Sequence, residues 1–528
     1  MMLDAALDQL ARAYPGPGGA CAVLREGEVL VRHSWGWANA ERRIRFTPRS
    51  LFRLCSITKQ FTCAALLTEF PDPSVLDPQV RASLPALAQP APATLHLCHN
   101  QSGLRDYWAV AMLHGSAVEA PFGDTEARRV IRGTQTLQFM PGTRYSYANQ
   151  NFRLLSEILQ ERTGRSFGEL LRRSLFERVG MANAILAADT RALPDGTEGY
   201  EGTSQSGFRA AQNRILWTGD AGIGASLDDL IAWERFIDAT RDDADAIYRR
   251  LSVPVNFADG TPAHYGFGLS RHTEWDRALT GHGGALRGWR SHRLYVPAER
   301  ISVVVMFNHL SDAHAAALDL LGATLGVARA PRPPVIEAPA WTGAYLEPET
   351  GLVARIDTGD GRLRLRYGHS AERLDLGADG TAISAGTRLL PTADGVWMER
   401  RFDNHRSLLR RCDPMAPSGD ADTVPGLSSL TDLVGRYHCA ELDSEASVID
   451  AGGVLYGAFS GFLGQGRMEV LECVGRDVWL LPCPRALDHT PPGDWTLACR
   501  RDSLGRVAGI TIGCWLARGI RYERVAPC

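Results

Sequence analysis

The sequence contains one pair of side chains whose types and spacing suit nucleophilic chemistry, Ser56 and Lys59, within residues 54–61 (LCSITKQF). Lys59 is the single lysine among the 57 lysines and arginines of the chain. A lysine shielded from water can lose its proton and act as a base, whereas an arginine cannot. A serine hydroxyl is a weak nucleophile until such a base takes its proton. Because residues three apart on a helix share a face, the spacing predicts a serine acyl-transfer enzyme.

A serine that caps a helix, followed by one surface lysine, is nearly always the better explanation of an isolated Ser-x-x-Lys. Two observations favour the chemical interpretation: Lys59 stands alone, and the apolar residues within 61–67 have the spacing of a largely buried helix. We therefore predict one helix over residues 52–68 that carries Ser56 and Lys59 near its start. The helix dipole and the unpaired N–H groups favour negative charge at that end.

A second group with suitable chemistry lies in residues 145–151 (YSYANQN). The phenol of Tyr147 can relay a proton if it lies near a lysine, and the amide of Asn149 can hold a substrate carbonyl. Taken alone, this stretch is more typical of a polar helix cap.

A third group lies in residues 280–290 (TGHGGALRGWR), where glycines flank His282 at the start of a predicted edge strand. Glycine leaves a strand free of side chains where another backbone can approach closely. We therefore expect a substrate to lie against the strand at Gly283 and Gly284.

The elements that must position these groups combine strands and helices. Two strands at 19–24 and 29–35 are predicted to form a hairpin at a sheet edge. Further strands are predicted at 265–269, 293–295 and 302–307. Residues 145–151 are predicted to lead into a helix that runs through Gly164, and a further helix is predicted over 313–325. The glycine-rich loop at 219–226 (GDAGIGAS) lacks the Gly-x-Gly-x-x-Gly order of a phosphate site, so it predicts close backbone packing beside a site instead.

Two proline-rich stretches divide the chain. Residues 328–340 form a stiff linker after the first unit, and residues 414–429 form a second linker rich in proline, glycine and serine. Between and after them, short alternating strands recur, and a weak repeat relates Gly343 to Gly435. The expected fold class is α+β, with a first domain over 1–330 followed by two small antiparallel β-barrel domains over 341–414 and 430–528.

The composition limits the classes of partner. A net charge of −3 and an isoelectric point near 6.5 argue against nucleic acid and anionic membranes as partners. Residues 1–18 are acidic and amphipathic, so we expect no signal peptide, and no apolar run is long enough to cross a bilayer. The eleven cysteines have no zinc-ribbon spacing, which predicts reduced thiols in the cytoplasm and neither a metal nor a cofactor.

The three groups occur in the order Ser-x-x-Lys, Tyr-x-Asn and His-x-Gly, and the first unit thereby resembles the penicillin-recognising serine enzymes. This family includes the class C β-lactamases, the DD-carboxypeptidases and their esterase and peptidase relatives. The resemblance implies a β-lactamase-like catalytic domain in which an antiparallel sheet is covered by helices. The two C-terminal β domains and residues 100–108 (NQSGLRDYW) resemble most closely the members that remove D-residues from the amino end of peptides.

The resemblance also implies roles for individual residues. Ser56 would attack the scissile carbonyl, and Lys59 and Tyr147 would share the proton transfers. Asn149 would orient the substrate, and the N–H groups of Ser56 and Ala285 would form the oxyanion hole.

His282 replaces the lysine that is commoner in the third motif of this family. A histidine is mostly neutral near pH 7, so it binds a substrate carboxylate less well than a lysine does. This favours a substrate without that carboxylate, although Arg287 and Arg290 could restore a positive field.

An aminopeptidase must hold a free ammonium group, and an unpaired charge in a dry site costs several kcal/mol. We hypothesise that the irregular loop at 482–494 reaches the active site and that Asp488 pairs with the ammonium. A surface turn with a solvated aspartate is an equally good interpretation of this loop.

The function expected from the residues and the resemblance is a D-stereospecific aminopeptidase that releases an N-terminal D-residue such as D-alanine through a Ser56 acyl-enzyme. Its substrate would be a small peptide or amino-acid amide, and the family resemblance suggests a homodimer. The alternatives are a DD-carboxypeptidase or esterase that acts on N-blocked substrates, and an inert binding protein on the same scaffold.

Overall fold

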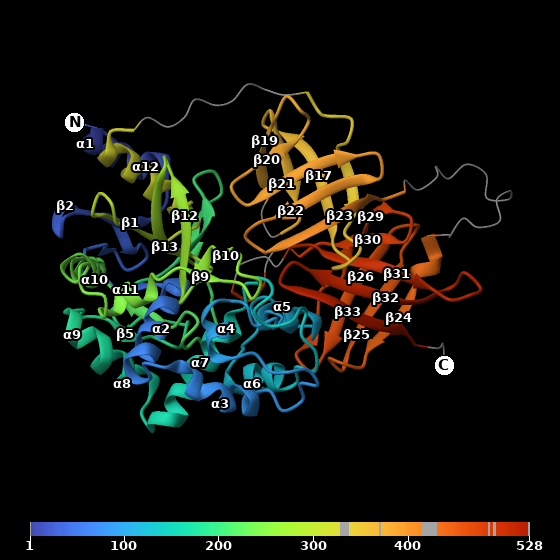
Figure 1. Cartoon of the computed structure of the whole chain (residues 1–528), viewed down its shortest axis with the longest axis horizontal. Helices are drawn as coiled ribbons and strands as arrows, with labels where there is room; N and C mark the ends of the chain where they lie inside the picture. Colours follow the sequence, from blue (N-terminus) through green and yellow to red (C-terminus); the bar gives the residue numbers. More distant parts are fainter. Residues whose placement is uncertain are drawn as a thin grey trace.

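The computed structural model of the protein describes residues 2–327, 337–368, 371–413, 430–483, 486–488 and 493–525. Most of both predicted linkers falls outside these ranges, and the domain limits given above stay predictions. Figure 1 shows a large body of helices and strands formed by the N-terminal part, beside two β-sheet bodies formed by the C-terminal part.

An eight-stranded antiparallel sheet forms the centre of the N-terminal body, with the order β11-β12-β13-β14-β15-β1-β2-β3. Its strands are β1 (Gly18–Arg25), β2 (Glu28–Asn39), β3 (Ile44–Arg45), β11 (Tyr265–Gly266), β12 (Leu269–Glu274), β13 (Arg277–Leu286), β14 (Trp289–Val296) and β15 (Ile301–Phe307). Helices α1 (Met2–Ala13) and α12 (Ala313–Leu325) pack on one face of this sheet through a shared apolar cluster.

The predicted hairpin is present as β1 and β2, and it lies towards one edge of the sheet. β1 pairs with β15 on one side and with β2 on the other. Seven of its eight residues are buried, because both faces of this strand are covered. The short strand β3 pairs with β2 only at Trp37 and Asn39, so in the described residues most of β2 forms the edge that the sequence predicted.

The other face of the sheet is covered by a helical layer that shares the largest apolar cluster of the protein. Its helices are α2 (Thr58–Glu69), α3 (Asp77–Ser83), α4 (Thr94–Cys98), α5 (Tyr107–Leu113), α6 (Asp124–Arg132), α7 (Asn149–Thr163), α8 (Phe167–Leu171), α9 (Glu177–Val179), α10 (Leu227–Ala239) and α11 (Ile247–Leu251). Small sheets join β4 (Phe52–Arg53), β8 (Ile223–Ala225) and β5 (Ile185–Leu186), then β6 (Tyr200–Thr203) with β7 (Gly207–Ala210), and β9 (Val255–Asn256) with β10 (Pro262–Ala263).

The first C-terminal body is a closed barrel of eight antiparallel strands. They are β16 (Gly343–Leu346), β17 (Val353–Gly359), β18 (Arg362–Arg366), β19 (Glu372–Leu376), β20 (Ala382–Ile383), β21 (Thr387–Thr392), β22 (Gly395–Arg400) and β23 (His405–Arg411). Alternate residues of these strands are buried, as in Arg362–Arg366, and they fill the barrel with a separate apolar core.

The second C-terminal body is a ten-stranded antiparallel sheet that forms a half-barrel. Its strands are β24 (Gly435–Cys439), β25 (Ser444–Asp450), β26 (Leu455–Gly461), β27 (Gly464–Gln465), β28 (Glu469–Val470), β29 (Glu472–Gly475), β30 (Val478–Leu481), β31 (Trp495–Arg501), β32 (Val507–Cys514) and β33 (Ala517–Arg524). The predicted repeat corresponds to the first hairpin of each C-terminal body, which begins at Gly343 and at Gly435.

The predicted fold class is confirmed: an α+β unit is followed by two antiparallel β units. The half-barrel packs against the helical layer, because Ala109 and Leu113 of α5 belong to its apolar core. In the part of the chain that the structure describes, no helix is long and apolar enough to cross a membrane.

Candidate active site

Ser56 lies on a tight turn between a strand and a helix. The predicted helix over 52–68 is wrong at its start, because Phe52 and Arg53 form β4, which pairs with β8. A 3₁₀ turn (Cys55–Ile57) follows, and α2 begins only at Thr58. Cys55 has a left-handed φ of 51°, which non-glycine residues rarely adopt, and this interrupts the helical path just before Ser56. The turn leaves Ser56 half-buried at the start of a buried helix.

Lys59 is fully buried on the first turn of α2 and directs its Nζ atom at Ser56. The Nζ–Oγ distance is 3.0 Å. The same Nζ lies 2.8 Å from Asn149 Oδ1 and 2.7 Å from the carbonyl oxygen of Asp220. Burial lowers the pKa of Lys59 to about 8, although the negative charges of nearby aspartates oppose this shift. The predicted meeting of the serine and the lysine is therefore present in the structure.

Tyr147 and Asn149 reach the same point from the start of α7. Asn149 is the first residue of that helix, and Lys59 Nζ lies 4.9 Å from the centre of the Tyr147 ring. Burial raises the pKa of Tyr147 well above its usual value, and a hydrogen bond to Ser56 only partly offsets this effect. The phenol therefore keeps its proton near neutral pH, which leaves Lys59 as the group closest to a neutral base.

Asp106 is a site residue that the sequence reasoning missed. It is fully buried, and its Oδ2 accepts the N–H of Asn149 at 2.7 Å and the Nδ2 of the same residue at 2.9 Å. These bonds turn the Oδ1 of Asn149 towards Lys59. Burial raises the pKa of Asp106 to about 6, although the hydrogen bonds from Asn149 act against it. In the sequence, Asp106 is recognisable only as a residue that could cap a helix. It does cap α5, because its Oδ1 accepts the N–H of Trp108.

The third group lies on the half of β13 that has a strand on one side only. β12 pairs with β13 as far as Gly281, whereas β14 pairs with it as far as Leu286. Within the described residues, 282–286 therefore present one edge without a partner strand. A Cβ atom at Gly284 would lie 2.2 Å from the carbonyl oxygen of Leu54, so only glycine lets β13 approach the turn that carries Ser56 so closely.

His282 is neutral in this position. Its Nε2 lies 3.1 Å from the hydroxyl of Tyr265, and its Nδ1 lies 2.6 Å from the carbonyl oxygen of Gly283. Burial and the nearby charge of Lys59 lower the pKa of His282 to about 3. The neutral ring agrees with the expectation that this position does not attract a substrate carboxylate.

These groups meet in a cavity of about 500 Å³. The predicted site residues on its wall are Ser56, Tyr147, Asn149, His282, Gly283, Gly284, Ala285 and Asp488. Asp488 is 7 % exposed, and it lines the cavity together with Ala486; residues 484, 485 and 489–492 of the predicted loop lie outside the described residues. Lys59 is fully buried and is not part of the wall, but it contacts Ser56 directly.

Arg287 is the predicted site residue that the structure places elsewhere. It is not part of the cavity wall, and its guanidinium pairs with Glu201 at 2.7 and 3.1 Å. Arg290 does line the cavity, and its Nη1 donates to the carbonyl oxygens of Leu286 and Trp289. The turn at Gly288, with a φ of 82°, separates the two arginines and sends them to different surroundings.

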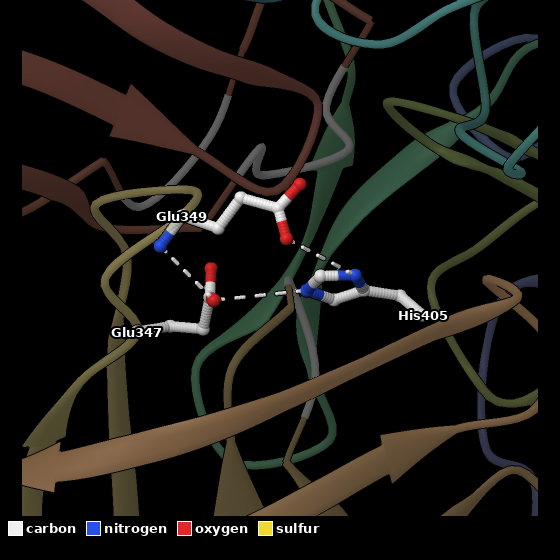
Figure 2. Close-up of side chains that lie close together, drawn as sticks. All are labelled: Glu347, Glu349 and His405. Atoms are coloured by element: carbon white, nitrogen blue, oxygen red, sulfur yellow. Dashed lines mark hydrogen bonds and ion pairs between the residues drawn. The ribbon is translucent and has the colours of Figure 1, made fainter.

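One group of side chains in the described residues has the composition of a metal site: Glu347, Glu349 and His405, on the closed barrel. Figure 2 shows that the two carboxylates approach opposite nitrogens of the imidazole. Glu347 Oε1 lies 3.7 Å from Nε2, and Glu349 Oε2 lies 3.9 Å from Nδ1. Both distances are longer than a hydrogen bond, and the two carboxylates face different ring nitrogens, so the three side chains form a row of longer polar contacts.

The sequence matches two known family models and is similar to curated proteins over almost its whole length. Residues 3–327 match the model of the β-lactamase family, and residues 334–523 match the model described as D-aminopeptidase, domain B. A D-aminopeptidase of Gluconobacter oxydans is 60% identical over 529 residues, which cover 99% of this chain and 98% of that protein. A D-aminopeptidase of Brucella melitensis is 45% identical over 524 residues, which cover 99% of this chain and 98% of that protein.

Solved structures share the fold. The octameric penicillin-binding protein homologue from Pyrococcus abyssi has a TM-score of 0.52 at 21% identity, and the match covers 77% of this chain and 99% of that one. The structure of SurE has a TM-score of 0.52 at 20% identity, covering 78% of this chain and 96% of that one. These two matches concern the fold alone.

Proposed function

The chain belongs to the D-aminopeptidases of the β-lactamase family, and from that premise we propose that it is a serine hydrolase that releases N-terminal D-residues. Its substrates would be small peptides, amides or esters of D-alanine or a similar residue with a free amino group. The reaction would pass through an acyl-enzyme on Ser56.

The observation that carries this proposal is the buried contact of 3.0 Å between Lys59 Nζ and Ser56 Oγ. A charged lysine would use its three protons on Ser56, Asn149 and Asp220. A neutral lysine keeps two of these donations and turns its lone pair to the serine hydroxyl. With a pKa of about 8, roughly a tenth of the molecules have this neutral lysine at pH 7.

The steps follow from these positions. Ser56 Oγ attacks the carbonyl carbon of the substrate while its proton moves to Lys59. The N–H groups of Ser56 and Ala285 would stabilise the negative oxygen, at roughly 3 kcal/mol per donor. Tyr147, which keeps its own proton, would pass a proton from Lys59 to the leaving nitrogen. Water would then release the acyl group from Ser56 by the reverse sequence of proton transfers.

The choice of substrate would depend on two residues of the cavity wall. The neutral His282 offers no charge to a substrate carboxylate, which supports an exopeptidase acting at the amino end. The carboxylate of Asp488 lies on the same wall as Ser56, which supports its pairing with the substrate ammonium. Asn149 would orient the substrate carbonyl, and Gly283 and Gly284 would let the substrate backbone lie along β13.

We also propose a cellular location and an oligomeric state for the protein. We place it in the cytoplasm, because all ten cysteines within the described residues are free thiols. A homodimer is the assembly that the family resemblance suggests.

The deciding experiment compares hydrolysis of D-alanine p-nitroanilide, its L-isomer and N-acetyl-D-alanine p-nitroanilide by the purified protein. Turnover of the free D-amine alone supports the proposal. Turnover of the acetylated compound would indicate an esterase or DD-peptidase that acts on N-blocked substrates. Turnover of none of the three would favour an inert binding protein, for which Lys59→Arg should leave ligand binding almost unchanged.

A further inference from the structure

The segment 143–149 carries Tyr147, and its backbone is held from two sides. On the side of the helical layer, Asn100 accepts the N–H of Ser146 at 3.0 Å through its carbonyl oxygen and the N–H of Ala148 at 3.2 Å through its side chain. Asn100 therefore holds the residues immediately before and after Tyr147. It is fully buried, so these bonds are shielded from competing water.

The other side is held by the closed barrel, through the turn that joins β22 to β23. Asn404 Nδ2 donates to the carbonyl oxygen of Thr143 at 3.0 Å, and the N–H of Tyr145 donates to the carbonyl oxygen of Asp403 at 3.2 Å. These contacts join residues that are separated by about 260 positions in the chain. The barrel thus holds the segment by hydrogen bonds at Thr143 and Tyr145, four and two residues before Tyr147.

A third contact lies between these two. The guanidinium of Arg144 pairs with Glu349 of the barrel at 2.5 Å. Glu349 also faces the imidazole of His405, the first residue of β23, whose other nitrogen faces the buried Glu347 (Figure 2). The glutamate that pairs with Arg144 is therefore part of the same polar row as the barrel strand behind it.

The turn also sets one wall of the cavity. The carboxylate of Asp403 is 2 % exposed and accepts the indole N–H of Trp515, from the half-barrel, at 3.1 Å. Tyr145 and Trp515 both line the cavity. Although burial raises the pKa of Asp403, the charges of Arg400 and Arg518 hold it below its usual value, so this acceptor is ionised at neutral pH.

We propose that the β22–β23 turn of the barrel is a positioning element of the active site, with Asn404 and Asp403 as the positioning residues that hold residues 143–145 and thereby set the place of Tyr147 beside Ser56. The closed barrel then contributes to the active site, although none of its described residues lines the cavity. The expected change in kcat/KM rests on the proposed function, whereas the expected change in the hydrogen exchange of residues 143–149 does not.

The test uses two matched substitutions in the full chain. Asn404 has a left-handed φ of 49°, so Asn404→Gly keeps a backbone conformation that glycine adopts readily. The substitution removes the side-chain bonds to the carbonyl oxygen of Thr143 and to Asp259 Oδ2. Asp360, in the β17–β18 turn of the same barrel, has a φ of 51° and is 81 % exposed. Asp360→Gly is therefore the same kind of change at a turn that does not touch segment 143–149.

The kinetic measurement compares kcat/KM for D-alanine p-nitroanilide and for the p-nitrophenyl ester of D-alanine. The anilide nitrogen needs a proton to leave and p-nitrophenolate does not, so a displaced Tyr147 should slow the amide more than the ester. We expect Asn404→Gly to lower the amide value roughly three- to tenfold, the effect of one lost hydrogen bond, with a smaller loss on the ester. Asp360→Gly should match the wild type on both substrates. Equal losses on amide and ester, or equal losses in the two variants, would overturn the proposal.

A second measurement stays valid if the protein proves to have no aminopeptidase activity. Hydrogen–deuterium exchange of the peptide that spans residues 143–149 should become faster in Asn404→Gly and stay unchanged in Asp360→Gly. Residues in β1, at the centre of the large sheet, should exchange as in the wild type in both variants. Unchanged exchange at 143–149 in Asn404→Gly would refute the positioning role, whatever the substrate assays show.

Discussion

The pH dependence of turnover provides the sharpest test of Lys59 as the base. Its pKa of about 8 means that the neutral fraction should be about 9% at pH 7, 50% at pH 8 and 91% at pH 9. At saturating D-alanine p-nitroanilide, kcat reports the groups of the enzyme–substrate complex. We therefore expect kcat to rise about fivefold from pH 7 to pH 8, about twofold from pH 8 to pH 9, and then to level off.

The alternatives give different curves. A lysine of ordinary pKa would make kcat rise about a hundredfold from pH 7 to pH 9 without levelling. If a tyrosinate were the base, the rise in kcat would occur at still higher pH, because burial raises the pKa of Tyr147. A flat profile from pH 6 to pH 9 would remove Lys59 from the proton transfer altogether. Each of these results would refute the assignment.

The substitution Lys59→Arg separates the base from the positive charge. Arginine keeps the charge but cannot become neutral, so kcat should fall by roughly a hundred- to ten thousandfold, the usual contribution of a general base. Because the site is fully buried, the thermal midpoint and the circular dichroism spectrum of the variant must be measured beside its activity. A well-folded Lys59→Arg protein with near-normal kcat would contradict the mechanism.

Three further predictions concern the cavity, the turn at Ser56 and the stability of the fold. Asp488→Asn should raise KM for D-alanine p-nitroanilide at least about tenfold, because a charged hydrogen bond is worth roughly 1.5–3 kcal/mol. Any residual turnover of the N-acetyl compound should stay unchanged, and equal effects on both substrates would contradict the ammonium pocket. Gly284→Ala should lower kcat by roughly a hundredfold, because its Cβ would lie 2.2 Å from the Leu54 carbonyl oxygen and push the Ser56 turn away from β13; a kcat equal to that of the wild type would contradict this contact. His99, His264 and His282 are buried with pKa values lowered to about 3, 4 and 3. Below pH 6.5 the unfolded chain binds more protons at these histidines, so each should remove about 1.4 kcal/mol of stability per pH unit between pH 6 and pH 4, partly offset by Asp106, whose raised pKa acts in the opposite direction. Denaturant unfolding at several pH values measures this slope, and stability that stays constant over that range would show the histidines to be solvated.

Much of the architecture could be predicted because its signals are local. The helix that follows Ser56, the strand at His282 and the change to short strands after residue 340 each show in a window of a few residues. The start of α2 could not be predicted, because the pairing of Phe52 with Ala225 and the left-handed Cys55 depend on a strand far away in the chain. The hairpin β1–β2 was assigned correctly, but the pairing of β1 with β15 could not be predicted, because β15 comes much later in the sequence.

The site residues divide in the same way. Ser56 and Lys59 lie one helical turn apart, so their spacing alone predicts that they meet. Asp106 escaped notice because a helix cap and a buried partner of Asn149 look the same in a sequence. Arg287 and Arg290 are equally basic and close together, and only the turn at Gly288 decides that Arg290 reaches the cavity.

The sequence by itself determined the chemistry of this protein: a serine, a single lysine, a tyrosine and a glycine-flanked histidine, in an order and at spacings that local geometry makes meaningful. The tertiary structure decided which of them can act. It buries Lys59 and so lowers its pKa, leaves residues 282–286 of β13 without a strand on one side, and brings Asp488 to the cavity and the barrel turn to residues 143–145. Burial and contacts between distant segments set these properties, and neither is encoded in the spacing of neighbouring residues.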